Sequence, residues 1–237
     1  MRSAAERGLA ILFPTDLPAI LDAETLVPVV ALSLWVSLSA TLLASLCGIP
    51  LGAALAIYRF PGRCLVIVVV NAFLGLPPVV VGLALYMLLS RSGLLGGLGL
   101  LFSPRAMVLE QALLAIPIVT ALVHSASIEL WAEFGGALLI DGATRPRALP
   151  HLLAMGRTRL VTAVLAGFGR TISEVGAILM VGGNIAGYTR TMTTAIVLET
   201  SKGNLSLALG LGFVLIGISI VVSATIFALG MRGGRLW

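Results

Sequence analysis

Two charged side chains, Arg170 and Glu174, stand four residues apart in a stretch that is otherwise apolar enough to cross a membrane. A charge at the centre of a bilayer costs about 2.5–3.5 kcal/mol, so each side chain needs a partner, a protein neighbour or a water-filled cavity. Residues four apart face the same side of a helix. They can form a structural ion pair that hides both charges, or a pair that breaks and re-forms as a pore alternates. We expect no tight anion site beside Glu174.

A run of hydroxyl and amide side chains follows, between Gly182 and Asn204. Tetrahedral oxyanions are held by such neutral donors together with main-chain N–H groups. Two interpretations stay open: a solvated loop whose Thr and Asn residues cap helices, or a loop that gates a pathway or meets an external binding protein. The candidate residues of this outer polar loop are Asn184, Thr189, Arg190, Thr193 and Thr194.

Prolines supply a third candidate feature. Pro77 and Pro78 lie side by side in an uncharged apolar segment, and Pro117 lies in the next one. Proline lacks the backbone N–H and interrupts the helical ladder. Such kinks often serve packing alone, but a bent helix that lines a pore can also form a gate. The candidate pathway or gate residues are therefore Pro77, Pro78, Arg170, Ser173 and Glu174.

The composition places these features in a membrane. Of the 237 residues, 59% are hydrophobic and only 11% are charged, with a mean hydropathy of +1.10. A soluble domain carries roughly 25% charged residues. The net charge of +5 would otherwise suggest a nucleic-acid partner. In a membrane protein it reflects cytoplasmic loops rich in Lys and Arg, so no nucleic acid is expected.

The hydrophobic pattern predicts an all-α integral membrane protein. Spanning the hydrocarbon takes about 20 apolar residues. Five segments are long enough, and with no repeat or linker evident we expect one domain over residues 1–237. The predicted transmembrane helices cover residues 27–58, 65–90, 106–127, 160–181 and 205–231.

Arginine placement predicts the orientation in the cell membrane. With the N-terminus outside, the inner side holds eight arginines and the outer side six basic residues. Arg2 and Arg7 lie far from the first span, where the positive-inside rule weakens, so this orientation, with a cytoplasmic C-terminus, is favoured. Residues 1–24 lack the apolar run of a cleaved signal peptide, and we expect a short interfacial helix there.

The longest inner loop in this topology covers residues 128–158. Its segment 137–144 can form a short amphipathic helix closed by a glycine. Lys202 is the only lysine and follows Ser201, so the chain has no Gly-Lys-Ser/Thr phosphate loop. Any ATP that drives transport must therefore bind another subunit. His124 and His151 lie far apart in sequence without a metal-ligand pattern, so no metal site is expected.

This inner loop resembles the cytoplasmic loop of ATP-binding-cassette (ABC) importer permeases, whose pattern is Glu-Ala-Ala-x-x-x-Gly followed by hydrophobic-x-Leu-Pro. Aligned on Gly142, Ala137 matches the first alanine, while Gly136 replaces the glutamate and Leu138 the second alanine. In that family the loop forms a helix that docks into a cleft on the ATPase and couples it to the membrane helices. The resemblance gives this role to Ala137, Leu138, Asp141, Gly142 and Ala143.

A second resemblance covers nearly the whole chain. The run Phe-Gly-Arg-Thr-Ile-Ser-Glu-Val-Gly-Ala at 168–177, Gly-Gly-Asn-Ile at 182–185 and Thr-Arg-Thr-Met-Thr-Thr at 189–194 are very similar to the permease subunit of tungstate-type ABC importers. Molybdate permeases share the Arg-x-x-Ser-Glu-x-Gly-Ala core. Pro-Pro-Val-Val-Val-Gly at 77–82 and Gly-Ile-Pro-Leu-Gly at 48–52 extend the likeness.

The resemblance implies a type I ABC importer permease fold with a cytoplasmic coupling-helix loop. It implies that two copies form a pathway at their interface. It also implies ATPase subunits inside, which carry ATP and Mg, and an extracytoplasmic substrate-binding protein. The implied substrate is an oxyanion, tungstate first, with molybdate or sulfate as alternatives. No cofactor is expected in this chain.

Two other classes of function are weighed against this one. An intramembrane hydrolase needs a nucleophile and a base close together, and no Gly-x-Ser-x-Gly or His-Glu-x-x-His pattern is present. A stand-alone secondary transporter would more naturally show inverted repeats, and none is evident. The sequence therefore favours a transport subunit that is not itself an enzyme.

Overall fold

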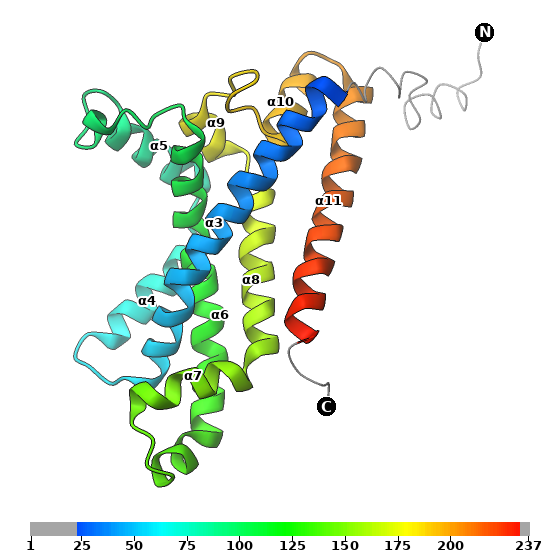
Figure 1. Cartoon of the computed structure of the whole chain (residues 1–237). Helices are drawn as coiled ribbons and strands as arrows, with labels where there is room; N and C mark the ends of the chain where they lie inside the picture. Colours follow the sequence, from blue (N-terminus) through cyan, green and yellow to red (C-terminus); the bar gives the residue numbers. More distant parts are fainter. Residues whose placement is uncertain (1–22, 233–237) are drawn as a thin grey trace.

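The fold is a computed structural model that describes residues 23–232, and every regular element within that range is helical (Figure 1). The interfacial helix expected over residues 1–24 lies almost entirely outside the described residues. Three helices are long and apolar enough to cross a membrane: α3 (Ala23–Ile57), α6 (Pro104–Ile140) and α11 (Leu205–Arg232). They overlap the first, third and fifth predicted spans, and two bent helix pairs bring the possible total to five.

The predicted span 65–90 is wrong as a single helix. It forms α4 (Arg63–Leu74) and α5 (Pro78–Leu89), whose axes differ by 105°. The expected interruption at the paired prolines is confirmed, and it is a break rather than a kink. Pro77 adopts an extended backbone (φ −64°, ψ 122°), since a residue before proline avoids the α conformation. Pro78 then occupies the first turn of α5, where no N–H is needed.

The predicted span 160–181 is also broken. α8 (Arg157–Ile172) ends early and α9 (Gly176–Gly182) begins after a gap of three residues, 173–175. At the gap Val175 leaves helical geometry (φ −127°, ψ −54°), and the Glu174 side chain accepts a hydrogen bond from a backbone N–H of α9. A side chain that bonds the nearby backbone in this way competes with the helical ladder. α8 also meets α7 (Arg145–Met155) at 76°.

The third predicted span is too short, and the loop predicted for 128–158 is mostly helical. α6 continues past residue 127 to Ile140, and α7 occupies 145–155. No proline interrupts 128–140, and α6 continues through Gly135 and Gly136, so the carboxylates there end the apolar stretch without ending the helix. The separate short helix expected at 137–144 is therefore the last turn of α6 plus a tight turn. α6 also passes Pro117 without a break.

Small residues hold the centre of the bundle together. α3 and α6 pack along much of their length with α8 against both, and the cluster between them contains Ala44, Ala53, Ala115, Val119 and Ala163. Small side chains let membrane helices approach closely. The remaining helices are α10 (Met192–Ser201) and the short 3₁₀ helix η1 (Gly96–Leu98).

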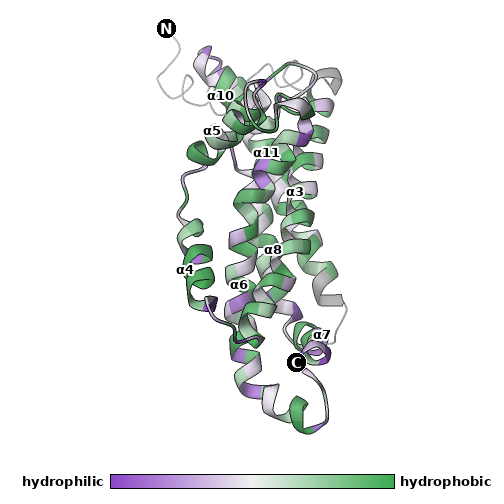
Figure 2. Cartoon of the chain, turned by 90° about the vertical axis from the view of Figure 1, so that its left-hand side faces the viewer, coloured by the Kyte–Doolittle hydropathy of each residue, from purple (hydrophilic) through white to green (hydrophobic). Residues whose placement is uncertain are grey.

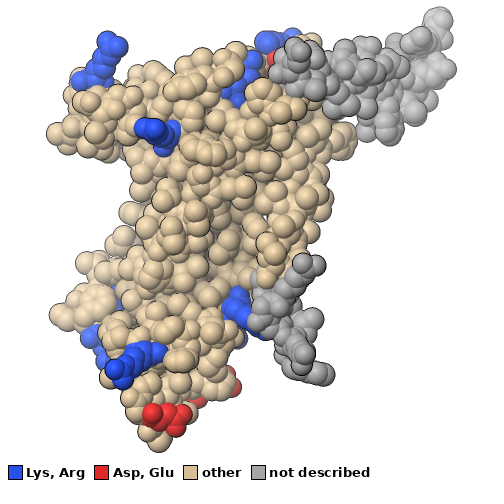
Figure 3. All heavy atoms as spheres, in the orientation of Figure 1, with Lys and Arg blue, Asp and Glu red and all other residues tan. Residues whose placement is uncertain are grey.

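The surface has the polarity of a membrane protein. In Figure 3 the Lys, Arg, Asp and Glu side chains on the visible face gather at its two ends and leave the middle uncharged. Hydrophobic residues dominate the helices between those ends (Figure 2), and large apolar side chains such as Leu46, Val68 and Ile220 are exposed. The protein is therefore a multi-pass membrane protein. We call its two ends the α7 end and the α10 end.

Candidate functional site: the helix break and the coupling turn

The predicted ion pair between Arg170 and Glu174 is confirmed. The Arg170 Nη1 atom lies 2.6 Å from Glu174 Oε2, with 5% of the glutamate side chain exposed and 28% of the arginine side chain. The pair does not lie on one continuous helix, because Arg170 is in the last turn of α8 and Glu174 is in the break. The Glu174 N–H still donates to the Thr171 carbonyl, and this turn keeps the two side chains together.

Glu174 ties the break to two further helices. Its Oε1 atom accepts a hydrogen bond from the Ala177 N–H (3.2 Å), and its carbonyl accepts one from the Thr193 hydroxyl at the start of α10 (2.9 Å). Ser173 does not join this group, because its exposed hydroxyl donates back to the Gly169 carbonyl (2.7 Å). Glu174 thus connects α8, α9 and α10 through its carboxylate and its backbone carbonyl.

The proline break lies against the same region. α5, which starts at Pro78, packs on α9 so closely that a Cβ on Gly82 would stand 2.7 Å from Ala177 Cα. A Cβ on Gly176 would stand 2.9 Å from a Val79 methyl group. The structure therefore brings the helix that begins at the proline break next to the helix that Glu174 caps, although Pro77 and Pro78 do not contact the ion pair in any hydrogen bond.

The outer polar stretch is solvated only in part: residues 185–188 and 200–204 are exposed, whereas several of the candidate threonines are not. Thr189, Thr193 and Thr194 are buried, and the last two belong to α10. The capping part of the prediction is confirmed: Thr191 caps α10, and its hydroxyl and that of Thr194 each bond the other residue's N–H in a capping box. Thr189 donates to the Gly182 carbonyl (2.5 Å) and accepts from the Ile185 N–H (2.9 Å).

The remaining polar groups of this end are mutually paired. Arg190 Nε donates to Asn184 Oδ1 (3.3 Å), and Asn184 holds the left-handed backbone at φ 50°. Glu199, in the last turn of α10, accepts hydrogen bonds from Asn204 and from Lys202 in the turn that follows. The bond from Asn204, then that from Lys202, lowers the pKa of the Glu199 carboxyl. Most of these side chains therefore stabilise turns, and their polar atoms are already engaged in hydrogen bonds.

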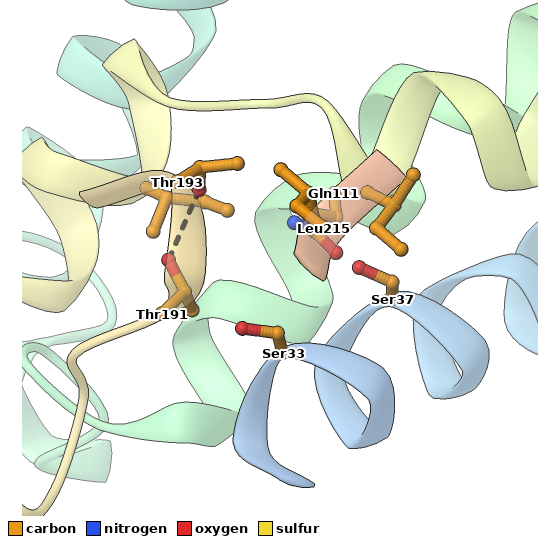
Figure 4. Close-up of a pocket in the computed structure, with 8 residues that line it drawn as sticks. Ser33, Ser37, Gln111, Thr191, Thr193 and Leu215 are labelled. Carbon is orange, nitrogen blue, oxygen red and sulfur yellow. Dashed lines mark hydrogen bonds between the residues drawn. The ribbon is translucent and has the colours of Figure 1, made fainter. Parts of the chain in front are cut away.

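A small polar cavity lies beside the break (Figure 4). It has room for about one water molecule, too little for a tetrahedral oxyanion. Gln111 donates from Nε2 to the Thr171 carbonyl (2.8 Å), which leaves its buried Oε1 without a partner among the described residues. The polar side chains that line the cavity are Ser33, Ser37, Gln111, Thr191 and Thr193.

Sequence reasoning missed a row of hydroxyl side chains on α3 that runs beside this cavity. On α3, Ser33 accepts the Met192 N–H (2.8 Å), and Thr41 lies 3.1 Å from the Thr171 hydroxyl. Ser33, Ser37 and Thr41 recur at every fourth position of an uncharged helix. That spacing places them on one face and was a signal in the sequence that this face contacts polar groups.

The predicted coupling residues lie in the turn that ends α6. The Gly142 N–H donates to the Leu139 carbonyl (3.2 Å) and the Ala143 N–H to the Leu138 carbonyl (3.0 Å), with Gly142 at φ +83°. This is the Schellman pattern, and it confirms the predicted closure by a glycine. Ala137 is in the last turn of α6, and Asp141 is its C-terminal cap.

The coupling turn is anchored to two other helices. Leu138 packs against a cluster that contains Ala56 and Ile57 of α3 and Leu152 of α7. About two helical turns earlier on α6, Glu129 is ion-paired with Arg159 of α8 at 2.5 Å. Movement of this turn would therefore reach α3 and α7 directly.

Gly142→Val should damage this turn while Gly142→Asn should not. Left-handed geometry costs a β-branched residue about 1–2 kcal/mol, whereas asparagine tolerates it. No atom of the described residues lies within 4 Å of the Cβ that a side chain would add there, so backbone strain is the only cost. We expect Gly142→Val to reduce uptake coupled to ATP hydrolysis in the assembled transporter. Full coupled uptake by Gly142→Val would show that the assignment of this turn to coupling is wrong.

No metal centre accompanies these features: in the described part of the chain, no three His, Cys, Asp or Glu side chains gather closely enough to hold an ion. The hydrogen-bonded break at one end and the anchored turn at the other are joined by long helices. Neither contains an arrangement of nucleophile and base.

Comparison with known proteins identifies the class. The chain is 39% identical over 209 residues to a probable anion ABC transporter permease protein of Haloferax volcanii, covering 86% of this chain and 90% of that protein. It is 37% identical over 201 residues to the tungstate uptake system permease protein TupB of Peptoclostridium acidaminophilum, covering 85% and 88%. The TupB protein of Campylobacter jejuni is 39% identical over 167 residues, 70% of each chain. No family model matches the chain.

A multi-pass helical fold with relatives that are permeases defines a membrane transport subunit, not the intramembrane hydrolase weighed above. At this identity over most of its length, the chain belongs to the ABC transporter permease family.

Proposed function

We propose that this chain is the membrane-spanning permease subunit of an ATP-driven importer for an oxyanion, with tungstate as its substrate. The similarity over 85% of the chain to a tungstate uptake permease carries the proposal. The match includes the region of the Arg170–Glu174 break on which α8, α9 and α10 converge. Two molybdenum permeases and a sulfate permease are also related, at 28–32% identity, and supply the alternative substrates.

The proposed orientation of the chain in the membrane rests on the number of basic residues at its two ends. The α7 end carries Arg59, Arg63, Arg145, Arg147, Arg157 and Arg159, against Arg91, Arg105, Arg190 and Lys202 at the α10 end. On the positive-inside rule we propose that the α7 end faces the cytoplasm and that the N-terminus is outside. There the turn 137–143 meets the partner ATPase, which binds ATP and Mg. At the other end an extracytoplasmic binding protein delivers the anion to a pathway between two copies of this chain.

We propose a type I importer permease that works as one domain with five spans, a number that the three long apolar helices and the two bent helix pairs allow. The anion pathway is not the polar cavity of Figure 4, because that cavity has room for only one water molecule. Hydroxyl groups near the break are engaged with backbone atoms rather than free. We therefore assign selectivity to the binding protein and alternating access to the permease.

Uptake into proteoliposomes tests this function. The permease is reconstituted with the ATPase and binding protein of its own system, and radiolabelled tungstate uptake is measured with and without ATP. We expect uptake only with ATP, and weak competition from molybdate and sulfate. Uptake without ATP would favour a secondary transporter, and equal use of tungstate and molybdate would contradict the narrower claim of tungstate selectivity.

A further inference from the structure

Gln111 carries a buried oxygen atom that the proposed mechanism leaves unexplained. The residue lies on α6 and is 2% exposed, and its Nε2 atom donates to the Thr171 carbonyl in the last turn of α8 (2.8 Å). This bond fixes the orientation of the amide and leaves Oε1 without a hydrogen-bond partner among the described residues. Buried polar atoms are almost always bonded, either to protein or to ordered water, so this oxygen calls for a donor.

The Ser37 hydroxyl of α3 lines the same small cavity as Gln111. The Ser37 carbonyl accepts from the hydroxyls of Thr41 (2.7 Å) and Thr171 (3.3 Å), but the Ser37 Oγ atom takes part in no hydrogen bond within residues 23–232. In Figure 4 this hydroxyl points toward the Gln111 amide, yet the two groups are not bonded to each other. A free donor and an unpaired acceptor therefore border one space.

Two other hydroxyls of the lining are engaged but can still accept a proton donor. Ser33 Oγ donates to the Val29 carbonyl (2.8 Å) and accepts the Met192 N–H (2.8 Å). Thr193 Oγ1 donates to the Glu174 carbonyl (2.9 Å). A hydroxyl oxygen has two acceptor lone pairs, so Ser33 and Thr193 each keep capacity for a further bond. The cavity thus offers one free donor and several acceptors.

The size and the polarity of the cavity select one kind of ligand. It has room for about one water molecule, and the apolar side chains of Ile172, Ile178 and Leu215 close it. A buried water molecule typically makes about three hydrogen bonds, which matches the groups that border this space. No charged side chain lines the cavity, so an ion would lose hydration without a counter-charge in return.

We propose that this cavity is the binding site of one buried water molecule. The water donates one proton to Gln111 Oε1 and the other to Ser33 or Thr193, and it accepts the Ser37 hydroxyl proton. It thereby joins α6 to α3 and holds the Gln111 amide, which in turn holds the end of α8 beside the break. The site depends on neither the oxyanion nor ATP, so it is tested separately from the proposed function.

Ser37→Ala and Ser45→Ala form the matched pair that tests the site. Both serines lie on α3, and the Ser45 hydroxyl is also buried without a partner in the described part of the chain, but Ser45 is not among the residues that line this cavity. Both substitutions add the same helix propensity. Only Ser37→Ala removes a bond to the water, so we expect this variant to melt about 2–4 °C below Ser45→Ala in detergent. Equal melting temperatures would overturn the proposal.

A structure of the wild-type protein that resolves ordered water tests the site directly. We expect a density peak within about 2.7–3.2 Å of both Gln111 Oε1 and Ser37 Oγ. A cavity without this peak, in a map that shows other buried waters, would contradict the assignment.

A sodium ion is the other occupant of this size, and a change of salt separates it from water. The melting temperature of the wild type is measured in sodium chloride and in choline chloride at the same ionic strength. We expect the same value in both, because a water site has no need of the cation. A higher melting temperature in sodium chloride that disappears in Ser37→Ala would replace the water with a cation and overturn the proposal.

Discussion

Exchanging the two charges, Arg170→Glu with Glu174→Arg, should not restore the transport that either single change destroys. A simple ion pair between two side chains would tolerate the swap. In this fold Glu174 has a second task, because its Oε1 atom accepts the Ala177 N–H that starts α9. An arginine at 174 has no acceptor atom and would direct its charge at that N–H. The double variant therefore keeps the pair but loses the cap.

The single changes should be costly for a different reason. Removing one member of a buried pair leaves the other as an uncompensated charge, which costs about 3–5 kcal/mol when both are fully buried. Part of Arg170 reaches the surface, so we expect Arg170→Leu to lower the free energy of unfolding by about 3 kcal/mol, the lower end of that range. Thermal unfolding in detergent and uptake in proteoliposomes measure the two effects.

Glu174→Gln supplies the control for the swap. Glutamine keeps a side-chain oxygen for the Ala177 N–H and loses only the charge, so it should be milder than Glu174→Arg in thermal unfolding. Complete rescue of both stability and uptake by the double variant would mean that the contact with Ala177 contributes nothing. The break would then depend on the charge pair alone.

The sequence predicted the features that depend on local chemistry. Long uncharged runs predicted α3 and α11, the paired prolines predicted the interruption between α4 and α5, and spacing predicted the ion pair. Each of these follows from residue types within a few positions of one another. The glycine closure of α6 belongs to the same group, since only the residue itself decides whether φ +83° is tolerated.

Features that depend on tertiary contacts were not predictable in this way. No proline marks the break at 173–175, and the break depends on contacts of Glu174 with Thr193 and Ala177. The burial of Thr193 and Thr194 was not predictable from their own segment, because it depends on helices distant in sequence, such as α11 and α3, whose Ser33 accepts the Met192 N–H.

Gly52→Ala should be the most damaging single-methyl change in the bundle. A Cβ at this position would stand 2.5 Å from the Thr120 carbonyl oxygen, 2.9 Å from Val123 Cβ and 3.0 Å from the His124 nitrogen. Two of these are backbone atoms, so the clash is relieved only by separating α3 from α6. Overpacking a tight core costs about 1–3 kcal/mol, and we expect the upper end here.

Gly212→Ala is the matched control on α11, where no atom of the described residues lies within 4 Å of the added methyl group. Alanine is a better helix former than glycine by about 1 kcal/mol, so this variant should be neutral or slightly more stable. Thermal unfolding in detergent compares the two, and equal melting temperatures would contradict the close packing of α3 on α6.

The Gly52→Ala variant should also reduce uptake. Leu138 of the turn 137–143 contacts Ala56 and Ile57 at the end of α3, so separating α3 from α6 should disturb that turn. Loss of stability without loss of uptake would show that the contact between α3 and the turn 137–143 is not needed to transmit movement during transport.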